Sequence, residues 1–268
     1  MKSPGHTPNG QKRSGFLFLL SRLRSYLILD PLIFFYTAIF GIGSLLTSFF
    51  DKNGRKQHAF AREWSRTILR TSLSPVELIG VENLTSPAVV APNHISAMDI
   101  PVLYTLLPFP FRIVANKNLF SYPFLGWHLR RSGQIPIDRT TPKTTIKTLS
   151  TAVDDLQQGI SVVIFPEGGR SRTGEVQAFM NGAFYLAVKA QAPVLPVAIV
   201  GTYEMLPMDT FHIMPRLLKL VVGKPIPTAG LTLRDLDALA AQVKTAIEDL
   251  YYAHSDVPDP RTILATSH

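Results

Sequence analysis

Residues 88–99 read AVVAPNHISAMD, and residues 161–172 read SVVIFPEGGRSR. Each stretch opens with a short apolar run that is rich in Val and Ile and then turns polar within a few positions. Runs of this kind, bounded by Gly or Pro, are typical of strands buried inside a sheet. In an open α/β sheet, ligands bind just beyond the carboxyl ends of the strands. The two polar segments are therefore candidates for a functional site.

The same strand pattern recurs along the chain from residue 75 onward. Short apolar runs with strand character lie at 76–79, 88–91, 111–115, 134–137, 161–165, 194–200 and 218–222. Stretches with helical periodicity lie at 52–72, 142–158, 181–191 and 232–253. Alternation of strands and helices predicts an α/β fold, with a mixed, largely parallel sheet flanked by helices.

The composition narrows the classes of protein to consider. Of 268 residues, 46% are hydrophobic and 17% are charged, which excludes a wholly disordered chain. The chain has no Cys, so disulfides, thiolate metal sites and a cysteine nucleophile are excluded. The net charge of +8 indicates an anionic partner, which could be a nucleic acid, a phosphate-bearing substrate or an acidic membrane.

The N-terminal part of the chain contains a long apolar block. Pro31–Phe50 is 20 residues long without a charged side chain, and as a helix it would cover about 30 Å, the thickness of a bilayer core. One alternative is a single helix that spans the bilayer. The other is a hairpin in one leaflet, with helices at 16–29 and 32–50 and a bend at Asp30-Pro31.

The distribution of basic residues favours the hairpin. Lys and Arg flank the block on both sides, whereas a one-way span shows a marked imbalance between its two ends. Basic charge on both sides fits a segment that lies against an anionic membrane surface. A third alternative, a helix buried in the protein core, is disfavoured because soluble cores rarely contain so long an uncharged run.

His94 and Asp99 form the first candidate site. His94 follows a buried strand directly, and Asp99 falls in the first turn of the helix expected after it, so the two side chains can approach. A carboxylate at one imidazole nitrogen fixes the tautomer and leaves the other nitrogen as a base. The alternative is structural, with His94 at a helix cap and Asp99 at the positive helix end.

The second candidate site follows the strand at 161–165. Gly168 and Gly169 permit close approach of backbone to a ligand, and Arg170 and Arg172 carry donors suited to phosphate. The spacing is not that of a Walker loop. The alternative is a tight turn with solvated arginines.

Lys117 and Arg139 form a third candidate pair. Each lies just beyond a predicted strand, so both can face the same edge of the sheet as His94. The alternative is that both are ordinary exposed basic residues.

Together these stretches resemble the glycerolipid acyltransferase family, which includes 1-acylglycerol-3-phosphate acyltransferases. Four blocks occur in the order found in that family. Asn93-His94 through Asp99 is similar to its N-H-x4-D block, and 117–139 is similar to its second block. Phe165–Ser171 resembles the third block, F-P-E-G-T-R-S. Val194–Val197 resembles the short apolar fourth block.

Two positions depart from the pattern of the family. Gly169 stands where Thr is usual, which removes one hydroxyl but keeps the turn and Arg170. Asn118 stands where Glu, Ser or Lys is common, and this position leaves the identity of the acyl acceptor open.

The resemblance implies an enzyme of phospholipid synthesis. It implies transfer of a fatty acyl group from acyl-CoA or acyl-carrier protein to the free hydroxyl of 1-acylglycerol-3-phosphate, which gives phosphatidate. His94 would be the general base, oriented by Asp99, and attack would be direct, without an acyl-enzyme. The acyl donor is a co-substrate, and we expect no cofactor and no metal.

The resemblance also implies roles for the other residues. Lys117, Arg139 and Arg170 would bind the acceptor phosphate, and Glu167 would accept a hydrogen bond from an acceptor hydroxyl. Backbone N–H groups near Gly168 are candidates to stabilise the oxyanion.

Other functions remain as alternatives. Within the family, the acceptor could be glycerol-3-phosphate or another lysolipid. Outside it, the chain could be a non-catalytic membrane lipid-binding protein. A nucleic-acid binder is disfavoured because no nucleic-acid-binding signature occurs and the cations flank the apolar block.

These interpretations divide the chain into four parts. We expect a flexible tail at 1–15, a membrane-associated helical hairpin or span at 16–50, an acyltransferase α/β domain at 51–253 and a C-terminal tail at 254–268. The expected partners are anionic membrane lipids, the lysophospholipid acceptor and the acyl donor, without nucleic acid. The expected location is the cytoplasmic face of the inner membrane of a bacterium.

Overall fold

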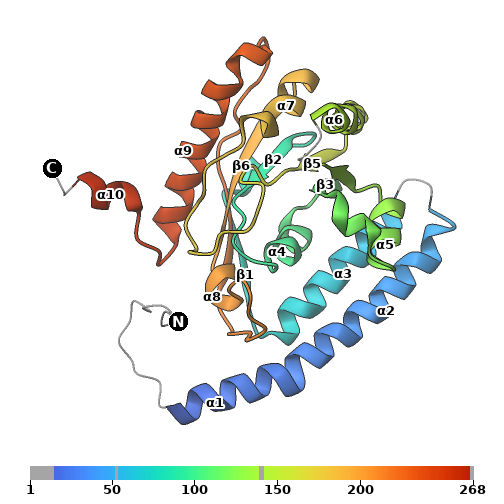
Figure 1. The fold of residues 1–268 in the computed structure, drawn as a ribbon, viewed down its shortest axis with the longest axis vertical. Coiled ribbons are helices and arrows are strands. Elements are labelled where there is room, and N and C mark those ends of the chain that lie inside the picture. The colour runs from blue at the N-terminus through green and yellow to red at the C-terminus, as the bar shows by residue number, and fades with distance from the viewer. Residues whose placement is uncertain (1–14, 52–53, 139–141, 266–268) are drawn as a thin grey trace.

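A computed structural model of the chain describes residues 15–51, 54–138 and 142–265, and its centre is a seven-stranded sheet (Figure 1). The strands are β1 Val76–Ile79, β2 Val89–Pro92, β3 Phe111–Asn116, β4 Ile135–Ile137, β5 Ser161–Val163, β6 Val194–Val200 and β7 Leu218–Val222. Their order is β1-β7-β6-β2-β5-β3-β4. Each strand lies within two residues of its predicted bounds.

The sheet is mixed and largely parallel, which confirms the predicted fold class. Strands β6, β2, β5, β3 and β4 run in one direction, whereas β7 is antiparallel to β6 and pairs in parallel with β1. In the register, Val89 of β2 lies between Val194 of β6 and Val162 of β5. The carboxyl ends of β2, β5 and β6 therefore meet at one edge.

The α-helices lie before, between and after these strands. They are α1 Gly15–Arg24, α2 Asp30–Ser48, α3 Arg55–Thr71, α4 Asp99–Leu106, α5 Leu125–Arg131, α6 Pro142–Gln157, α7 Tyr185–Ala190, α8 Thr202–Met205, α9 Leu236–His254 and α10 Pro260–Ala265. Single 3-10 turns are η2 Val81–Asn83, η3 Lys117–Ser121, η4 Asn181–Phe184 and η5 Leu233–Asp235, and η1, Ser25–Leu29, is π-helical.

Helices cover both faces of the sheet (Figure 1). Val89 and Ala91 of β2 pack in the core on the side of α6, α7 and α9, whereas Val90 packs in the core on the side of α3 and α4. This alternation follows from the two-residue period of a strand. Both sides of β2 are therefore apolar, as its sequence predicts.

The prediction of a helical hairpin at 16–50 is wrong. Gly15–Ser48 is one continuous helix of 34 residues. The Asp30 N–H donates to the carbonyl of Ser25, five residues back, so the chain has a π turn just before Pro31. A wider turn accommodates the proline ring and its missing N–H, which in a regular helix would cause a kink.

This helix is long and apolar enough to cross a membrane, yet it lies along the domain. Only 11% of its most apolar 18-residue window is buried, so the core-helix alternative is wrong as well. Ser25 Oγ donates to the Ile213 carbonyl over 3.0 Å and accepts from the Ile213 N–H over 2.9 Å. Further along, Trp64 Nε1 donates to Thr37 Oγ1 over 3.0 Å. The helix is thus attached to the domain at several points.

The two ends of the chain differ from the expectation in different ways. Residues 1–14 of the expected flexible tail lie outside the described residues, and Gly15 already begins α1. The expected C-terminal tail contains α10, so that prediction is wrong for Pro260–Ala265. Arg261 of α10 pairs with Asp249 of α9 over 2.8 Å, and this charge pair attaches the segment to α9.

Candidate active site

His94 and Asp99 lie together at the carboxyl edge of β2. His94 Nδ1 is 2.7 Å from Asp99 Oδ2. An ionised carboxylate can only accept hydrogen bonds, so Nδ1 carries the proton and Nε2 is the nitrogen that can take one. Asp99 opens α4, and its Oδ2 also accepts from the N–H groups of Ile95 and Ser96 over 2.8 and 3.0 Å.

Asp99 is fully buried, and its second oxygen has a partner from another strand. Thr202 Oγ1 donates to Asp99 Oδ1 over 2.6 Å. Thr202 is itself fully buried and follows β6 after Gly201, whose φ of +89° places it in the left-handed region. Four donors therefore hold a carboxylate that would be costly to bury alone.

Thr202 was not among the residues predicted from the sequence. The signal available was its position just past the buried run at 194–200, at the same edge as His94. The order of the strands, which puts β6 beside β2, was needed to use it.

The His94 ring is held on one face as well. It stacks on Phe165, with ring centroids 4.0 Å apart and an angle of 25° between the planes. The His94 side chain keeps 19% of its surface exposed. The ring is thus fixed by Asp99 and Phe165 and remains open to a substrate.

Glu167 connects two loops behind His94. Its Oε1 accepts from the His94 N–H over 2.7 Å, and its Oε2 accepts from the Gln177 N–H over 3.2 Å. Burial raises the pKa of Glu167 to about 8, and the two backbone hydrogen bonds act in the opposite direction. In this geometry, Glu167 positions the backbone of His94, a role that the sequence analysis did not foresee.

The turn after β5 is closed by its own backbone. Gly168 has a φ of +74°, and its N–H donates to the Phe165 carbonyl over 3.0 Å. Because that N–H is engaged in the turn, it cannot also donate to an oxyanion, and Gly168 is not an oxyanion donor in this geometry. A Cβ atom at Gly169 would meet no atom within 4 Å, so the backbone leaves open space where the Thr usual in the resembled family would begin. Arg170 follows and is exposed.

Lys117 lies on the same edge of the sheet as His94, but two strands away. It begins η3, directly after β3, and its ammonium pairs with Asp138, which follows β4. Because β5 lies between β2 and β3, the two strand ends are about 10 Å apart. Arg139 lies outside the described residues.

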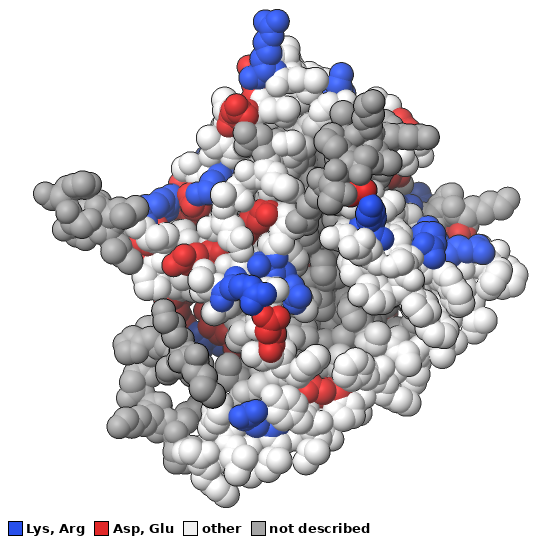
Figure 2. Space-filling view, in the orientation of Figure 1, with Lys and Arg blue, Asp and Glu red and all other residues white. Residues whose placement is uncertain are grey.

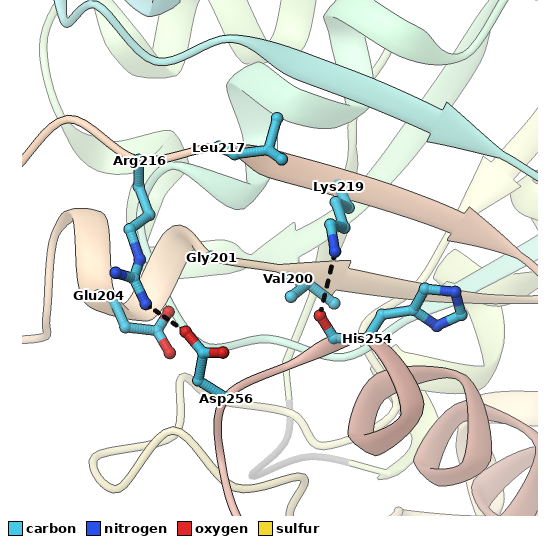
Figure 3. A pocket seen from close by; sticks show the side chains of 8 residues that line it. All are labelled: Val200, Gly201, Glu204, Arg216, Leu217, Lys219, His254 and Asp256. Atoms are coloured by element: carbon cyan, nitrogen blue, oxygen red, sulfur yellow. Dashed lines mark hydrogen bonds and ion pairs between the residues drawn. The ribbon is translucent and has the colours of Figure 1, made fainter. Parts of the chain in front are cut away.

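A separate cavity of about 240 Å³ lies beside α8 (Figure 3). Arg216 pairs with Asp256 over 2.6 Å at one end of it, and Lys219 Nζ reaches the His254 carbonyl at 3.5 Å at the other. The complete lining is Val200, Gly201, Glu204, Arg216, Leu217, Lys219, His254 and Asp256. The cavity is thus built without any of the candidate site residues.

Comparisons with known proteins agree with the geometry. A model of the acyltransferase family matches residues 75–200, which include His94, Asp99 and Glu167. A 1-acyl-sn-glycerol-3-phosphate acyltransferase of Saccharomyces cerevisiae is 30% identical over 213 residues, which are 78% of this chain and 70% of the relative. A chloroplastic 1-acyl-sn-glycerol-3-phosphate acyltransferase of Arabidopsis thaliana is 32% identical over 191 residues.

The coverage differs among these relatives. The match to the Arabidopsis enzyme takes in 69% of this chain and 53% of the relative, so this chain spans about half the length of that relative. The crystal structure of the 1-acyl-sn-glycerophosphate (LPA) acyltransferase PlsC from Thermotoga maritima has a TM-score of 0.67 and 27% sequence identity. That similarity covers 88% of this chain and 97% of the Thermotoga chain.

Proposed function

Because this chain belongs to the acyltransferase family, we propose that it transfers a fatty acyl group to the free hydroxyl of 1-acylglycerol-3-phosphate and so forms phosphatidate. The observation that carries this proposal is the hydrogen-bonded pair of His94 and Asp99 at the carboxyl edge of β2. The relatives named as 1-acyl-sn-glycerol-3-phosphate acyltransferases support the choice of acceptor.

The reaction starts with proton transfer to His94. Nε2 takes the proton of the acceptor hydroxyl, and the oxygen attacks the thioester carbonyl. The tetrahedral intermediate collapses with cleavage of the C–S bond. The leaving thiolate takes the proton from His94, which returns the imidazole to its neutral form. Asp99 stabilises the imidazolium between the two steps. General-base assistance of this kind contributes roughly 10²–10⁴-fold to the rate.

The acyl donor is acyl-CoA or acyl-carrier protein, and the chain acts on it directly. Lys117 and Arg170 leave the sheet at the same edge as His94, which supports their role as cations for the acceptor phosphate. Arg139 is proposed for the same role from its sequence position. Glu167 supports the reaction by holding the His94 backbone, and a substrate hydroxyl can use its remaining acceptor capacity.

The helix Gly15–Ser48 attaches the enzyme to the membrane from one side. A helix of 34 residues is about 51 Å long, more than the bilayer core of about 30 Å. Its contacts with Ile213 at one end and Trp64 further along support an orientation in the plane of one leaflet. We propose the cytoplasmic face of a bacterial inner membrane, where anionic lipids attract the basic residues around this helix.

Acyl transfer to lysophosphatidate in vesicles tests the proposal. Labelled acyl-CoA and acyl-carrier protein would be offered separately, with glycerol-3-phosphate as a second acceptor. We expect phosphatidate from the wild type and a loss of at least ~10²-fold for His94→Ala. His254→Ala, outside the site, is the matched control and should keep wild-type activity. Full activity of His94→Ala would contradict the mechanism, and activity only on glycerol-3-phosphate would replace the acceptor.

A further inference from the structure

The segment from Leu119 to Trp127 presents a cluster of large apolar side chains to the outside. Phe124 is 66% exposed, Tyr122 58% and Trp127 52%, and Leu119 and Leu125 are exposed beside them. A soluble surface carries single apolar side chains of this size, but a contiguous group marks an interaction site. We call Leu119–Trp127 the aromatic turn.

The backbone holds the aromatic turn in this shape. Phe124 has a φ of +60°, a region that a bulky side chain adopts only at a cost in free energy. A side-chain carbon at Gly126 would come within 2.1 Å of the Phe120 carbonyl oxygen, so the two halves of the turn pack directly on each other. The exposure of the aromatic rings is therefore a built feature of the fold.

The aromatic turn is continuous with the apolar surface of the N-terminal helix. α5 lies beside the C-terminal half of α2 (Figure 1), and Ser44 Oγ is 3.0 Å from His128 Nδ1. The Arg131 guanidinium lies 5.2 Å from the ring centre of Phe49, which is itself exposed. In Figure 2 the lower right edge, where α2 runs, is white, without basic or acidic side chains.

The chemistry of this surface identifies its occupant. Tyr and Trp are enriched where a bilayer meets water, since each ring has an apolar body and a polar group. Arg130 and Arg131, both exposed on α5, supply positive charge for anionic headgroups. The aromatic turn also follows closely after Lys117, which begins η3 directly after β3, on the edge that carries His94.

We propose that the aromatic turn inserts into the interfacial layer of the leaflet that holds the N-terminal helix, as a second membrane contact. Two contacts fix the rotation of the domain, which one helix in the membrane plane leaves free. The carboxyl edge of the sheet then faces the lipid from which an acceptor with an acyl chain arrives. This last consequence rests on the proposed function, whereas the membrane contact itself does not.

Trp127 reports the contact directly, because the chain contains only two Trp residues. The variant Trp64→Phe of the full chain leaves Trp127 as the single tryptophan, which is excited selectively at the red edge of the absorption band. It would be added to vesicles of phosphatidylcholine and phosphatidylglycerol, with and without brominated acyl chains. We expect a blue shift of the emission and quenching by the brominated lipids. Tyr122→Ser with Phe124→Ser should weaken binding to the same vesicles by about tenfold.

A tryptophan on the opposite layer of the fold is the matched control. Leu233 is exposed ahead of α9, and Leu233→Trp in a chain with Trp64→Phe and Trp127→Phe should show no quenching. Equal quenching of Trp127 and of the control, or none at either position in vesicle-bound protein, would overturn the proposal. An emission shift that follows protein concentration without vesicles would assign the surface to a second copy of the chain and overturn it too.

Acyl transfer measured on the same samples separates this proposal from the proposed function. Active, vesicle-bound protein with an unquenched Trp127 would reject the second contact alone. Inactive protein with a quenched Trp127 would reject the proposed function alone.

Discussion

The carboxyl edge of β2 and the outer face of α2 depart from the usual distribution of side chains in opposite directions. At the edge, the charged Asp99 is fully buried. On α2, large apolar side chains such as Phe34, Phe35 and Leu46 are exposed. Each departure costs free energy unless a partner compensates for it.

The partners lie in different places. Those of Asp99 are within the chain: His94, Ile95, Ser96 and Thr202 all donate to it. In the N-terminal helix, the Ser25 hydroxyl is likewise satisfied within the chain, by Ile213, but the apolar face of the helix is left open. A buried charge therefore identifies an internal site, and an open apolar face identifies a contact outside the chain.

The largest effect should come from Asp99→Asn. The amide keeps the size of the carboxylate but loses the charge that stabilises the imidazolium. Its NH₂ group would also face either the N–H groups of His94, Ile95 and Ser96 at the position of Oδ2 or the Thr202 hydroxyl at the position of Oδ1. We expect a fall in kcat of about 10²–10⁴-fold with vesicle binding unchanged. Steady-state rates and vesicle sedimentation check this, and a parallel loss of both would show that the two regions are not separable.

Glu167→Gln should give the next largest effect. One of the two N–H groups bound by Glu167 would then face an NH₂ group, which costs about 1–3 kcal/mol of stability. Because the NH₂ group can displace the His94 backbone, we expect kcat to fall about tenfold as well. Thermal unfolding and steady-state rates measure the two effects. Equal stability of variant and wild type would show that Glu167 does not hold the two loops.

The stability of the wild type should also depend on pH through Glu167. Its pKa in the folded chain, about 8, lies above its ordinary 4.5, so the folded state binds the proton more tightly. The stabilisation is complete below pH 4.5 and is lost as pH rises toward 8. Thermal unfolding across this window should show the decline in the wild type and a smaller one in Glu167→Gln. Parallel pH profiles would contradict the assignment to Glu167.

Thr202→Val tests the hydrogen bond from β6. Valine keeps the shape of the side chain and removes the donor to Asp99 Oδ1. A hydrogen bond to a charged group contributes roughly 1.5–3 kcal/mol. We expect part of this contribution to appear as a fall in kcat of about tenfold, with KM for the acyl donor unchanged. Thr202→Ser restores the hydroxyl and should restore most of the rate. An equal fall in kcat for Thr202→Ser and Thr202→Val would indicate that Thr202 acts through packing and not through its hydrogen bond to Asp99.

The smallest effect on catalysis should come from Ser25→Ala. This change leaves the buried N–H of Ile213 without its partner and the Ile213 carbonyl with Arg24 as its donor, and the unsatisfied N–H costs about 1–3 kcal/mol of stability. The rate per folded molecule in detergent should stay at the wild-type value. Thermal unfolding, and the rate divided by the folded fraction of the sample, separate the two quantities. A large loss of kcat would mean that the attachment of the helix reaches the catalytic edge.

Local patterns were enough to predict much of the fold. The seven strands follow from short β-branched runs between Gly and Pro, and each lies within two residues of its expected bounds. The approach of His94 and Asp99 also followed from local spacing, since both lie on one short strand–turn–helix segment. The α5 and α10 helices were missed because each is six or seven residues long, too short for a periodic pattern to register.

The sequence by itself determined the strands, the apolar helix and the His94–Asp99 pair, because each depends on residues close together along the chain. Only the tertiary structure decided that Thr202 meets Asp99, 103 positions away, and that Glu167 holds the backbone of His94. Those contacts depend on the strand order β6-β2-β5, which the packing of the whole sheet selects. The Asp30-Pro31 pair predicted a bend, but the structure has one continuous helix there. A π turn just before Pro31 accommodates the proline, because one wider turn makes room for its ring within the helix.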